Sequence, residues 1–418
     1  MTPSESDKMP PVNTIAMMTP GWPAGAIPNG ILASAAITRK ELMARGVCVK
    51  IITSDVSESA RNDPDVIDLK LGRDPHARRR LKARLMYRIA PAYKTYRDVA
   101  NGMLRGLRII GLDKVDLMEM EESFGSAALI EKATPFPIVV RLHGPWFING
   151  SVVGNPNDAA FRGRVYYEGK GIAAASAVTA PTHYTLDSTV RHYNLELRRA
   201  AVIPNPQEAA PPEHHWDLAQ CDRDTILFVG RFDRIKGGDV VIDAFARLAA
   251  EYPNLRLVFA GPDQGCRDDD GKMWTLPEYV SSHISDPGIA NRLEWLGSQP
   301  HDALPALRQK ALVTIVSSRS ETFGNTATEA MAQGCPIVSS TGGGLVEVIR
   351  DGYSGLHCRV GDPINLAERI AELLEDPERA ATLGANAMKD CAERFAPAVV
   401  ADQLLSFYGE VLADRKAR

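Results

Sequence analysis

The chain has 418 residues, which exceeds the size at which a single hydrophobic core keeps growing, so two domains are expected. Hydrophobic residues make up 44% of the chain and charged residues 24%, as is usual for a water-soluble globular protein. A formal net charge of −4 gives no overall positive field, which excludes nucleic acid as an expected partner and means that any anion site must be local.

The cysteines and the apolar runs bear on the cellular compartment. The six cysteines form no C-x-x-C pair and no tight cluster, which argues against a disulfide framework or a structural zinc site and suits a reducing cytosol. No run reaches the roughly 18 uninterrupted apolar residues of a membrane-spanning helix. We therefore expect a cytoplasmic protein, soluble or peripheral to a membrane, that begins with a flexible polar tail at residues 1–11.

The first half of the chain alternates short apolar runs with helical patterns. Helices are expected at 30–46 and within the long amphipathic stretch 76–110. Strands are expected at 13–20, 47–55, 115–121, 137–144 and 174–181. Apolar runs of this kind, separated by helices, are typical of strands that are buried on both faces of a parallel sheet.

A proline-rich connector at 201–216 interrupts this pattern and is the best candidate for a hinge, after which the alternation begins again. Strands are expected at 225–232, 254–263, 292–298, 312–320, 335–341 and 354–358, and the last sixty residues are expected to be helical. The pattern predicts two doubly wound α/β domains in tandem. Ligands of such sheets bind at the carboxyl ends of the strands, so the loops after the strands are the places to look for chemistry.

A glycine turn with two cations follows the first strand of the second half. Gly230 and Arg231 end this strand, Lys236 comes five residues later, and Gly237 opens a helix. The free N–H groups of a helix start, together with Arg and Lys, suit a diphosphate. The alternative is an ordinary surface Arg and Lys at a βα turn.

Two glutamates flank the start of a later helix. Glu321 follows a strand and Glu329 comes eight residues later, about 12 Å along the axis if the segment were wholly helical. This separation is too large for one compact metal or acid/base site unless Glu321 lies in the loop, but it could place two hydrogen-bond acceptors along an extended ligand. The alternative is a pair of solvated glutamates. Farther on, the turn Gly342–Gly344 precedes another helix start, where the backbone could approach a phosphate closely.

Four segments of the second half together resemble the retaining family 4 glycosyltransferases, in the family's order and spacing: GRFDRIKGG, the Glu321–Glu329 pair, EAMAQGCPIVSS and GGGLVEVIRDGYSGL. The first half resembles the family more loosely, through RLHGPWF (141–147), IPNPQE (203–208) and the loop 20–31. That loop reads Asn29-Gly30 where many relatives carry two adjacent glycines.

The resemblance implies an α/β architecture of the GT-B type. Two Rossmann-like doubly wound parallel-sheet domains would face each other across a cleft, and the C-terminal helix would cross back to the first domain. Residues 12–205, with the closing helix 397–418, would form the acceptor-binding domain, and residues 206–396 would form the donor-binding domain.

The resemblance also implies roles for individual residues. Arg231 and Lys236 would neutralise the diphosphate of a nucleotide sugar, Glu329 would accept hydrogen bonds from the ribose, and Glu321 would hold hydroxyls of the transferred sugar. His143 would approach the sugar or the acceptor. Further donor-site positions would be Phe323, Gly324, Asn325, Gly342, Gly343, Gly344, Leu345 and, from the other domain, Gly30.

The implied activity is retaining transfer of a hexose-type sugar from a nucleotide diphosphate sugar to a glycan or lipid-linked acceptor, as in cell-surface polysaccharide or glycolipid assembly. No cofactor and no metal are expected. The alternatives are a sugar-nucleotide epimerase, a phosphorylase-like enzyme of the same fold, or a non-catalytic nucleotide-sugar-binding partner subunit.

Four other segments allow both a functional and a structural interpretation. Residues 169–174 resemble a dinucleotide-binding fingerprint, but no acidic residue stands at a strand end about 20 positions downstream, so they are interpreted as structural. The acidic run 268–270 and the segment EHHWD (213–217) are not expected to bind metal. The stretch 76–97 holds eight Lys or Arg residues and no acid, which favours peripheral contact with an anionic membrane, against plain solvated surface as the alternative.

Overall fold

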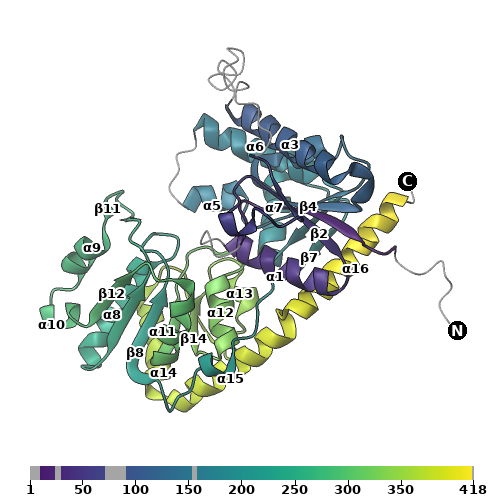
Figure 1. Ribbon diagram of the computed structural model, residues 1–418. Helices are drawn as coiled ribbons and strands as arrows, with labels where there is room; N and C mark the ends of the chain where they lie inside the picture. Colours follow the sequence, from purple (N-terminus) through teal and green to yellow (C-terminus); the bar gives the residue numbers. More distant parts are fainter. Residues whose placement is uncertain (1–9, 24–29, 71–90, 153–157, 417–418) are drawn as a thin grey trace. The chain divides into compact units, whose positions relative to one another are not determined.

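A computed structural model describes residues 10–23, 30–70, 91–152 and 158–416 of the chain (Figure 1). The chain divides into two compact units, the first comprising Met1–Pro206 with Pro397–Arg418 and the second comprising Gln207–Ala396. Among the described helices, none is both long enough and apolar enough to cross a membrane.

The first unit is built on a parallel sheet of seven strands in the order β3-β2-β1-β4-β5-β6-β7. The strands are β1 (Thr14–Met18), β2 (Cys48–Thr53), β3 (Val66–Asp68), β4 (Leu117–Glu121), β5 (Ile138–Arg141), β6 (Ala177–Ala180) and β7 (Ala200–Val202). The helices are α1 (Gly30–Ala44), α3 (Pro91–Ile110), α4 (Ala127–Ile130), α5 (Trp146–Val152), α6 (Ala159–Ala174), α7 (His183–Tyr193) and α16 (Pro397–Lys416).

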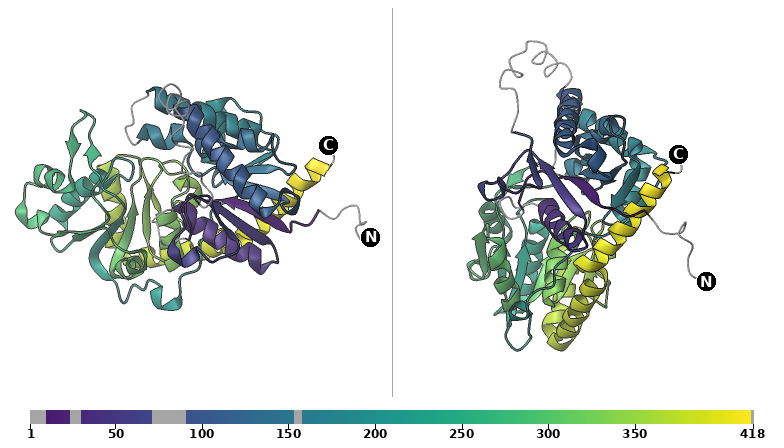
Figure 2. Two further views of the ribbon diagram at one scale, coloured as in Figure 1. Left: turned by 45° about the horizontal axis from the view of Figure 1, so that its top comes forward. Right: turned by 45° about the vertical axis from the view of Figure 1, so that its right-hand side comes forward.

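Because side chains alternate in direction along each strand, the core of this unit is divided between the two faces of the sheet. On β1, Ile15 belongs to the apolar cluster beneath α1 and α16, whereas its neighbour Ala16 belongs to the cluster beneath α3 and α6. Successive side chains of a strand point to opposite faces, so a continuous apolar run serves both layers. Helix α16 therefore lies beside α1 on the sheet of the first unit (Figure 2).

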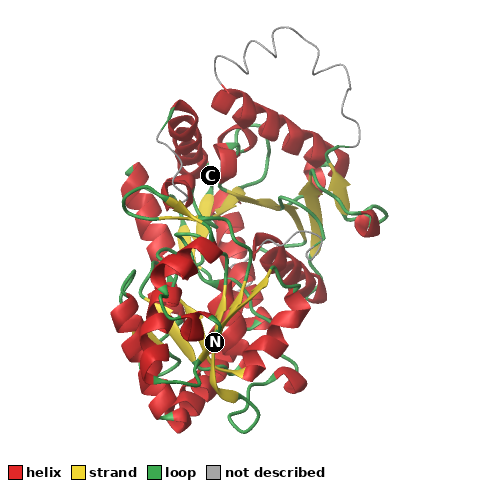
Figure 3. Cartoon of the chain, turned by 90° about the vertical axis from the view of Figure 1, so that its left-hand side faces the viewer, coloured by secondary structure: helices red, strands yellow, loops and turns green. Residues whose placement is uncertain are grey.

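The second unit repeats this plan on a parallel sheet of six strands in the order β12-β9-β8-β13-β14-β15. The strands are β8 (Asp222–Val229), β9 (Arg256–Ala260), β12 (Leu293–Gly297), β13 (Ala311–Val316), β14 (Ile337–Ser340) and β15 (Leu356–Cys358). The helices are α8 (Gly238–Glu251), α9 (Leu276–His283), α10 (Pro287–Ala290), α11 (Leu304–Lys310), α12 (Asn325–Gln333), α13 (Leu345–Val348), α14 (Pro363–Glu375) and α15 (Pro377–Arg394). In both units helices cover the strands on either side (Figure 3).

The two doubly wound parallel sheets predicted from the sequence are confirmed. Two details of the prediction were wrong or incomplete. The prediction missed the short strands β3 and β7. It also missed the hairpin that β10 (Cys266–Arg267) forms with β11 (Met273–Trp274). None of these strands carries a fully buried apolar run. Strand β7 overlaps the start of the expected connector. The interpretation of residues 169–174 as structural is confirmed, because they lie inside helix α6 and form no strand–turn–helix phosphate loop.

Candidate functional site

The candidate site of the second unit lies at the point where its strand order reverses. From β8 the chain first builds one side of the sheet with β9 and β12, and it then returns to place β13 on the other side of β8. The loops after β8 and β13 therefore meet at neighbouring carboxyl ends, where doubly wound sheets bind their ligands.

The loop after β8 is shaped by hydrogen bonds to Asp233. Its carboxylate accepts from Nε of Arg231 at 2.6 Å and from the backbone N of Lys236 at 2.8 Å. Gly237 then caps α8 with a φ of 70°, and a Cβ on it would lie 2.3 Å from the carbonyl oxygen of Ser317. Only glycine fits this left-handed conformation so close to a neighbouring backbone. The turn therefore presses the start of α8 against the loop after β13.

Lys236 and Glu321, which are 85 residues apart in the sequence, meet at this junction. Nζ of Lys236 lies 2.5 Å from Oε1 of Glu321, and the hydroxyl of Ser318 donates to the same oxygen at 2.8 Å. Side-chain exposure is 24% for Lys236 and 15% for Glu321, so the pair is partly buried but reachable. The structure thus brings one of the predicted cations into contact with one of the predicted acids.

The glycine turn after β14 adjoins the same loop. The backbone carbonyl of Glu321 accepts from the backbone N–H of Gly344 at 2.8 Å, and the backbone N–H of Glu321 donates to the carbonyl of Gly342 at 3.2 Å. Glu321 and Gly343 thereby pair as a single parallel β-bridge. A Cβ on Gly342 would lie 2.2 Å from the carbonyl oxygen of Ser318. The predicted Gly342–Gly344 turn is therefore part of the site, held against Glu321 by backbone contacts.

The segment Phe323–Asn325 leads from Glu321 into helix α12. The Phe323 side chain is buried in the core, so only its backbone is available to a ligand. Gly324 caps α12 with a φ of 101°, and a Cβ on it would lie 2.6 Å from the buried side chain of Leu345. Leu345 thus supports the loop from below, and its side chain is closed off from solvent.

Glu329 forms an ion pair that the sequence did not indicate. Its Oε2 accepts from Nη2 of Arg308 at 2.6 Å, and Arg308 is only 2% exposed. Glu329 itself is 22% exposed, and in the described part of the chain no ion pair joins it to Arg231 or Lys236. No local pattern singles out Arg308, because its partner lies 21 residues away.

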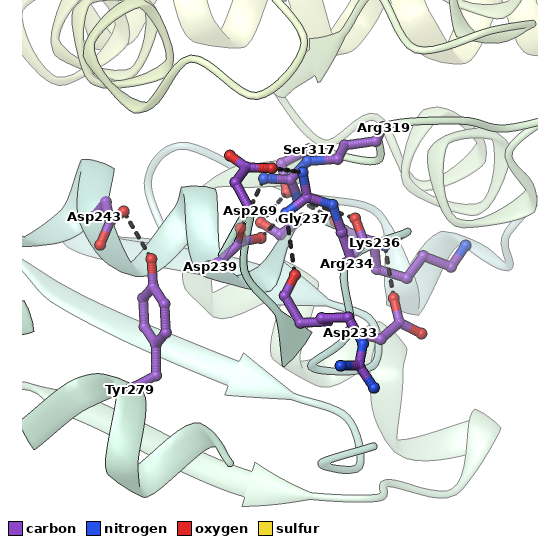
Figure 4. A network of polar contacts seen from close by, with 11 residues as sticks. Asp233, Arg234, Lys236, Gly237, Asp239, Asp243, Asp269, Tyr279, Ser317 and Arg319 are labelled. Atoms are coloured by element: carbon purple, nitrogen blue, oxygen red, sulfur yellow. Dashed lines mark hydrogen bonds and ion pairs between the residues drawn. The ribbon is translucent and has the colours of Figure 1, made fainter. Parts of the chain in front are cut away.

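A second arginine that sequence reasoning missed fixes the two loops to each other (Figure 4). Arg319 pairs with both carboxylate oxygens of Asp239, at 2.8 and 2.7 Å, and donates to the carbonyl of Arg234 at 2.9 Å. Ser317 donates to the carbonyls of Lys236 and Gly237, at 3.0 and 2.9 Å. These bonds set the distance between the loop that carries Lys236 and the loop that carries Glu321.

His143 and Gly30 belong to the first unit. The backbone N–H groups of His143 and Gly144 donate to the two oxygens of Glu122, at 3.0 and 2.8 Å, which holds the turn after β5. Loss of hydration around the imidazole, together with Arg141, lowers the pKa of His143 to about 3, so the ring is neutral at physiological pH. Gly30 is the exposed first residue of α1, and residues 24–29 of its loop lie outside the described residues.

The buried carboxylates behind this turn repel one another. Burial, followed by the nearby Glu168 and Glu121, raises the pKa of Glu122 to about 8. The pKa of Glu168 is also raised by burial, although Glu168 pairs with Arg164 at 2.9 Å. Sequence reasoning missed this cluster, because isolated glutamates in a strand and a helix look like surface residues.

The fold and the site together define a class of protein. Two doubly wound parallel sheets, with charged residues meeting at the strand ends of the second, match the two-domain architecture of the GT-B transferases. Comparison with known families agrees, because residues 28–208 match the model of Glycosyltransferase Family 4 and residues 212–390 match that of Glycosyl transferases group 1. The chain belongs to the family 4 glycosyltransferases and is a transferase.

Individual relatives support this assignment. The chain is similar to the D-inositol 3-phosphate glycosyltransferase 1 of Catenulispora acidiphila, with 29% identity over 70% of this chain and 71% of the relative. It is also similar to the D-inositol 3-phosphate glycosyltransferase of Acidothermus cellulolyticus, with 33% identity over 60% of this chain and 57% of the relative. The second match thus spans less than two thirds of that relative's length.

Solved structures share the fold. The sucrose-phosphate synthase of Thermosynechococcus elongatus has a TM-score of 0.69 at 22% identity, with 96% of this chain and 100% of that chain covered. Anabaena HepE, solved in complex with UDP and glucose, has a TM-score of 0.64 at 18% identity, with 94% of this chain and 98% of that chain covered. These likenesses confirm the GT-B architecture expected from the sequence.

Proposed function

We propose that the chain is a retaining glycosyltransferase that moves a hexose-type sugar from a nucleotide diphosphate sugar to a glycan or lipid-linked acceptor. The observation that carries this proposal is the contact of Lys236 with Glu321, in a loop where Asp233 binds both the side chain of Arg231 and the backbone of Lys236. Two cations suit the phosphates of a sugar diphosphate, and a nearby carboxylate can accept hydrogen bonds from the hydroxyls of its sugar. Solved relatives of the same fold bind UDP and UDP-glucose.

In the proposed reaction the acceptor hydroxyl oxygen bonds to the anomeric carbon as the bond from that carbon to the phosphate oxygen breaks. The bonding electrons stay on the departing phosphate, which takes up the proton of the acceptor on the same face of the sugar. Arg231 and Lys236 stabilise the negative charge that grows on this leaving group. Glu321 orients the sugar by accepting hydrogen bonds from its hydroxyls, and no covalent intermediate is invoked.

The proposal includes no metal and no organic cofactor. Arg231 and Lys236 supply the positive charge that a divalent ion supplies in other transferases. Activity is expected to persist in excess EDTA, whereas metal-dependent transfer would show activity that returns when Mg²⁺ or Mn²⁺ is added back.

We further propose that the enzyme is cytoplasmic and contacts anionic membrane through residues 76–97. Residues 76–90 lie outside the described residues, but 91–97 form the first turns of α3, which carry Lys94 and Arg97. The cluster of positive charge in this stretch suits the inner face of a plasma membrane and a lipid-linked acceptor. Flotation with vesicles of phosphatidylserine and phosphatidylcholine at physiological salt would reveal binding, and protein that stays unbound would exclude this contact.

One experiment tests the transferase proposal against its rivals. The protein is first screened by thermal shift with UDP-, GDP- and ADP-hexoses, because a ligand of the folded state raises the melting temperature. The stabilising donor is then incubated with an acceptor panel that includes inositol phosphates, as the names of the relatives suggest. NMR spectroscopy of the product is expected to show the donor's anomeric configuration.

The rivals predict other outcomes. Isomerisation of the donor without acceptor would indicate an epimerase, and a requirement for inorganic phosphate or a pyridoxal cofactor would indicate a phosphorylase-like enzyme. Stabilisation by donor with no turnover on any acceptor would favour a non-catalytic binding subunit. An inverted product would overturn the retaining mechanism.

A further inference from the structure

Arg308 is a buried cation of the second unit and pairs with Glu329, one of the residues predicted to bind the donor. It lies on α11, is 2% exposed, and is one of the largest fully buried side chains of the described residues. A guanidinium in such a place is costly unless charge and hydrogen bonds compensate it. Within the described ranges its ion-pair partner is Glu329, at 2.6 Å, and its Nε has no hydrogen-bond partner.

The contacts of Arg308 fix its direction. Nη2 donates to Glu329 and Nη1 donates to Oε1 of Gln333 at 3.2 Å. Glu329 and Gln333 are four residues apart on α12 and therefore lie on the same face of the helix. Gln333 is anchored in turn, because its Nε2 donates to the carbonyl of His214 at 2.9 Å. The planar fork of Arg308 thus spans one helical turn of α12 and has little freedom to move.

The carboxylate of Glu329 is held on one side only. Oε2 accepts from the buried Arg308, whereas no hydrogen bond to Oε1 occurs among the residues that the structure describes. At 22% exposed, Glu329 is the more accessible member of the pair. A carboxylate can only accept hydrogen bonds, so its open side suits a ligand with hydroxyl donors. A rigidly held acceptor of this kind selects the ligand that carries those hydroxyls.

We propose that Arg308 is a positioning residue that orients Glu329 to accept hydrogen bonds from the vicinal hydroxyls of the donor's ribose. This inference rests on the proposed function, because it takes the donor to be a nucleotide sugar and uses the ribose contact that the family resemblance implies for Glu329. Its consequence is discrimination: the site distinguishes ribonucleotides from 2′-deoxyribonucleotides, and Arg308 is needed for that distinction although it does not touch the ligand itself.

The test compares one nucleoside diphosphate with its 2′-deoxy counterpart in the full-length protein. The probe is whichever of UDP, GDP and ADP stabilises the protein most, and binding is measured by calorimetry. The wild type is expected to prefer the ribonucleotide by about tenfold or more, as the loss of a hydrogen bond to a charged group predicts. Arg308→Met, which keeps the length of the side chain but removes the fork, is expected to reduce this preference to about twofold or less.

Three further variants separate positioning from stability. Glu329→Gln should lose the same preference, and Arg308→Met combined with Glu329→Gln should lose no more than either single change, because both act through one carboxylate. This double variant leaves no uncompensated buried charge, so it should fold even if Arg308→Met alone does not. Arg292→Met is the matched control, because Arg292 binds the backbone carbonyls of Ala249 and Tyr252 away from the site. It should lower the melting temperature and leave the ribose preference unchanged.

The possible results are distinguishable. If Glu329→Gln loses the ribose preference but Arg308→Met retains it, the positioning role of Arg308 is wrong and the donor site stands. If neither variant changes the preference, Glu329 does not contact the ribose, and the role that the family resemblance implies for Glu329 is wrong as well, whereas the transferase proposal, which is tested by turnover, stands apart from this result. If the double variant loses distinctly more preference than Glu329→Gln alone, Arg308 acts by a route other than Glu329, which also overturns the proposal.

Discussion

At the scale of single residues, the site is defined by which charges face each other. Lys236 meets Glu321 at 2.5 Å, and Arg231, in the same loop as Lys236, pairs with Asp233 at 2.6 Å. This cation and this acid neutralise each other in the absence of substrate. In the proposed reaction, binding of the donor lets the cation pair with the diphosphate and the acid with a sugar hydroxyl. The chemistry therefore depends on the position of two side chains more than on either group alone.

Glu321→Gln tests the role of this acid with little change of shape. The amide has one acceptor oxygen in place of two and carries no negative charge, so we expect turnover to fall by roughly 10²- to 10³-fold, as for loss of one polar contact to a transition state. Affinity for the free nucleoside diphosphate should change by less than about threefold. Steady-state kinetics and calorimetry measure the two quantities. Equal losses in both would contradict the assignment.

The pKa of Glu122 makes the stability of the first unit depend on pH. Its pKa is about 8 in the folded protein, compared with 4.5 for an exposed glutamate, so the folded state binds the extra proton between these values. Stability should therefore fall as pH rises from about 5 to 8, with a slope of at most about 1.4 kcal/mol per pH unit from this group. Below about pH 4.5 both states are protonated and the slope from this group should vanish.

Urea unfolding at pH 5, 6.5 and 8 measures this effect. Glu122→Gln is the matched variant, because the amide stays neutral over the whole range, and it should flatten the dependence. Glu121 and Glu168, whose pKa values are also raised by burial, will leave a residual slope. A variant with the same slope as the wild type would show that Glu122 is ionised in the folded protein.

At the scale of elements, the site depends on loops that fit closely enough to require glycine. Gly237, with a φ of 70°, begins α8 against Ser317, and Arg319 ties the same loop to Asp239. The helix start and the loop after β13 are thus one rigid assembly. Lys236 precedes this glycine directly, so a shift of the helix start would move the cation.

Gly237→Ala is expected to destabilise the second unit by several kcal/mol. The left-handed conformation alone costs an alanine about 1–2 kcal/mol, and the Cβ would lie 2.3 Å from the carbonyl oxygen of Ser317. Gly271→Ala is the control, because Gly271 has a φ of 84° but nothing within 4 Å of its Cβ position. Chemical denaturation should show only the conformational cost there. Equal losses in the two variants would mean that the contact with Ser317 relaxes freely.

At the scale of the whole molecule, the chain returns to its first unit at the end. Helix α16 buries Leu404 and Tyr408 in the core beneath β1, and the Tyr408 hydroxyl donates to Glu119 of β4. The first unit is therefore built from both ends of the sequence, and its core is incomplete without residues after 397.

Leu404→Ala tests this arrangement. Truncating a fully buried leucine usually costs about 2–5 kcal/mol, so the first unit should unfold at lower denaturant concentration. Hydrogen exchange should report lost protection in β1, β2 and α1, with the second unit unchanged. Leu412→Ala, at a partly buried position of the same helix, should cost much less. Lost protection mainly in β8 and β13 would contradict the membership of α16 in the first core.

The sequence by itself determined the two doubly wound sheets, most strand positions and the loops that carry the candidate residues. Apolar runs, glycines and helix starts are local features, so they are readable without tertiary structure. Strands β3 and β7 escaped because short, partly buried edge strands lack an apolar run. Only the tertiary structure decided that Lys236 contacts Glu321 and that Arg308 lies beneath Glu329, because these partners are brought together by the order of the strands rather than by their spacing in the chain.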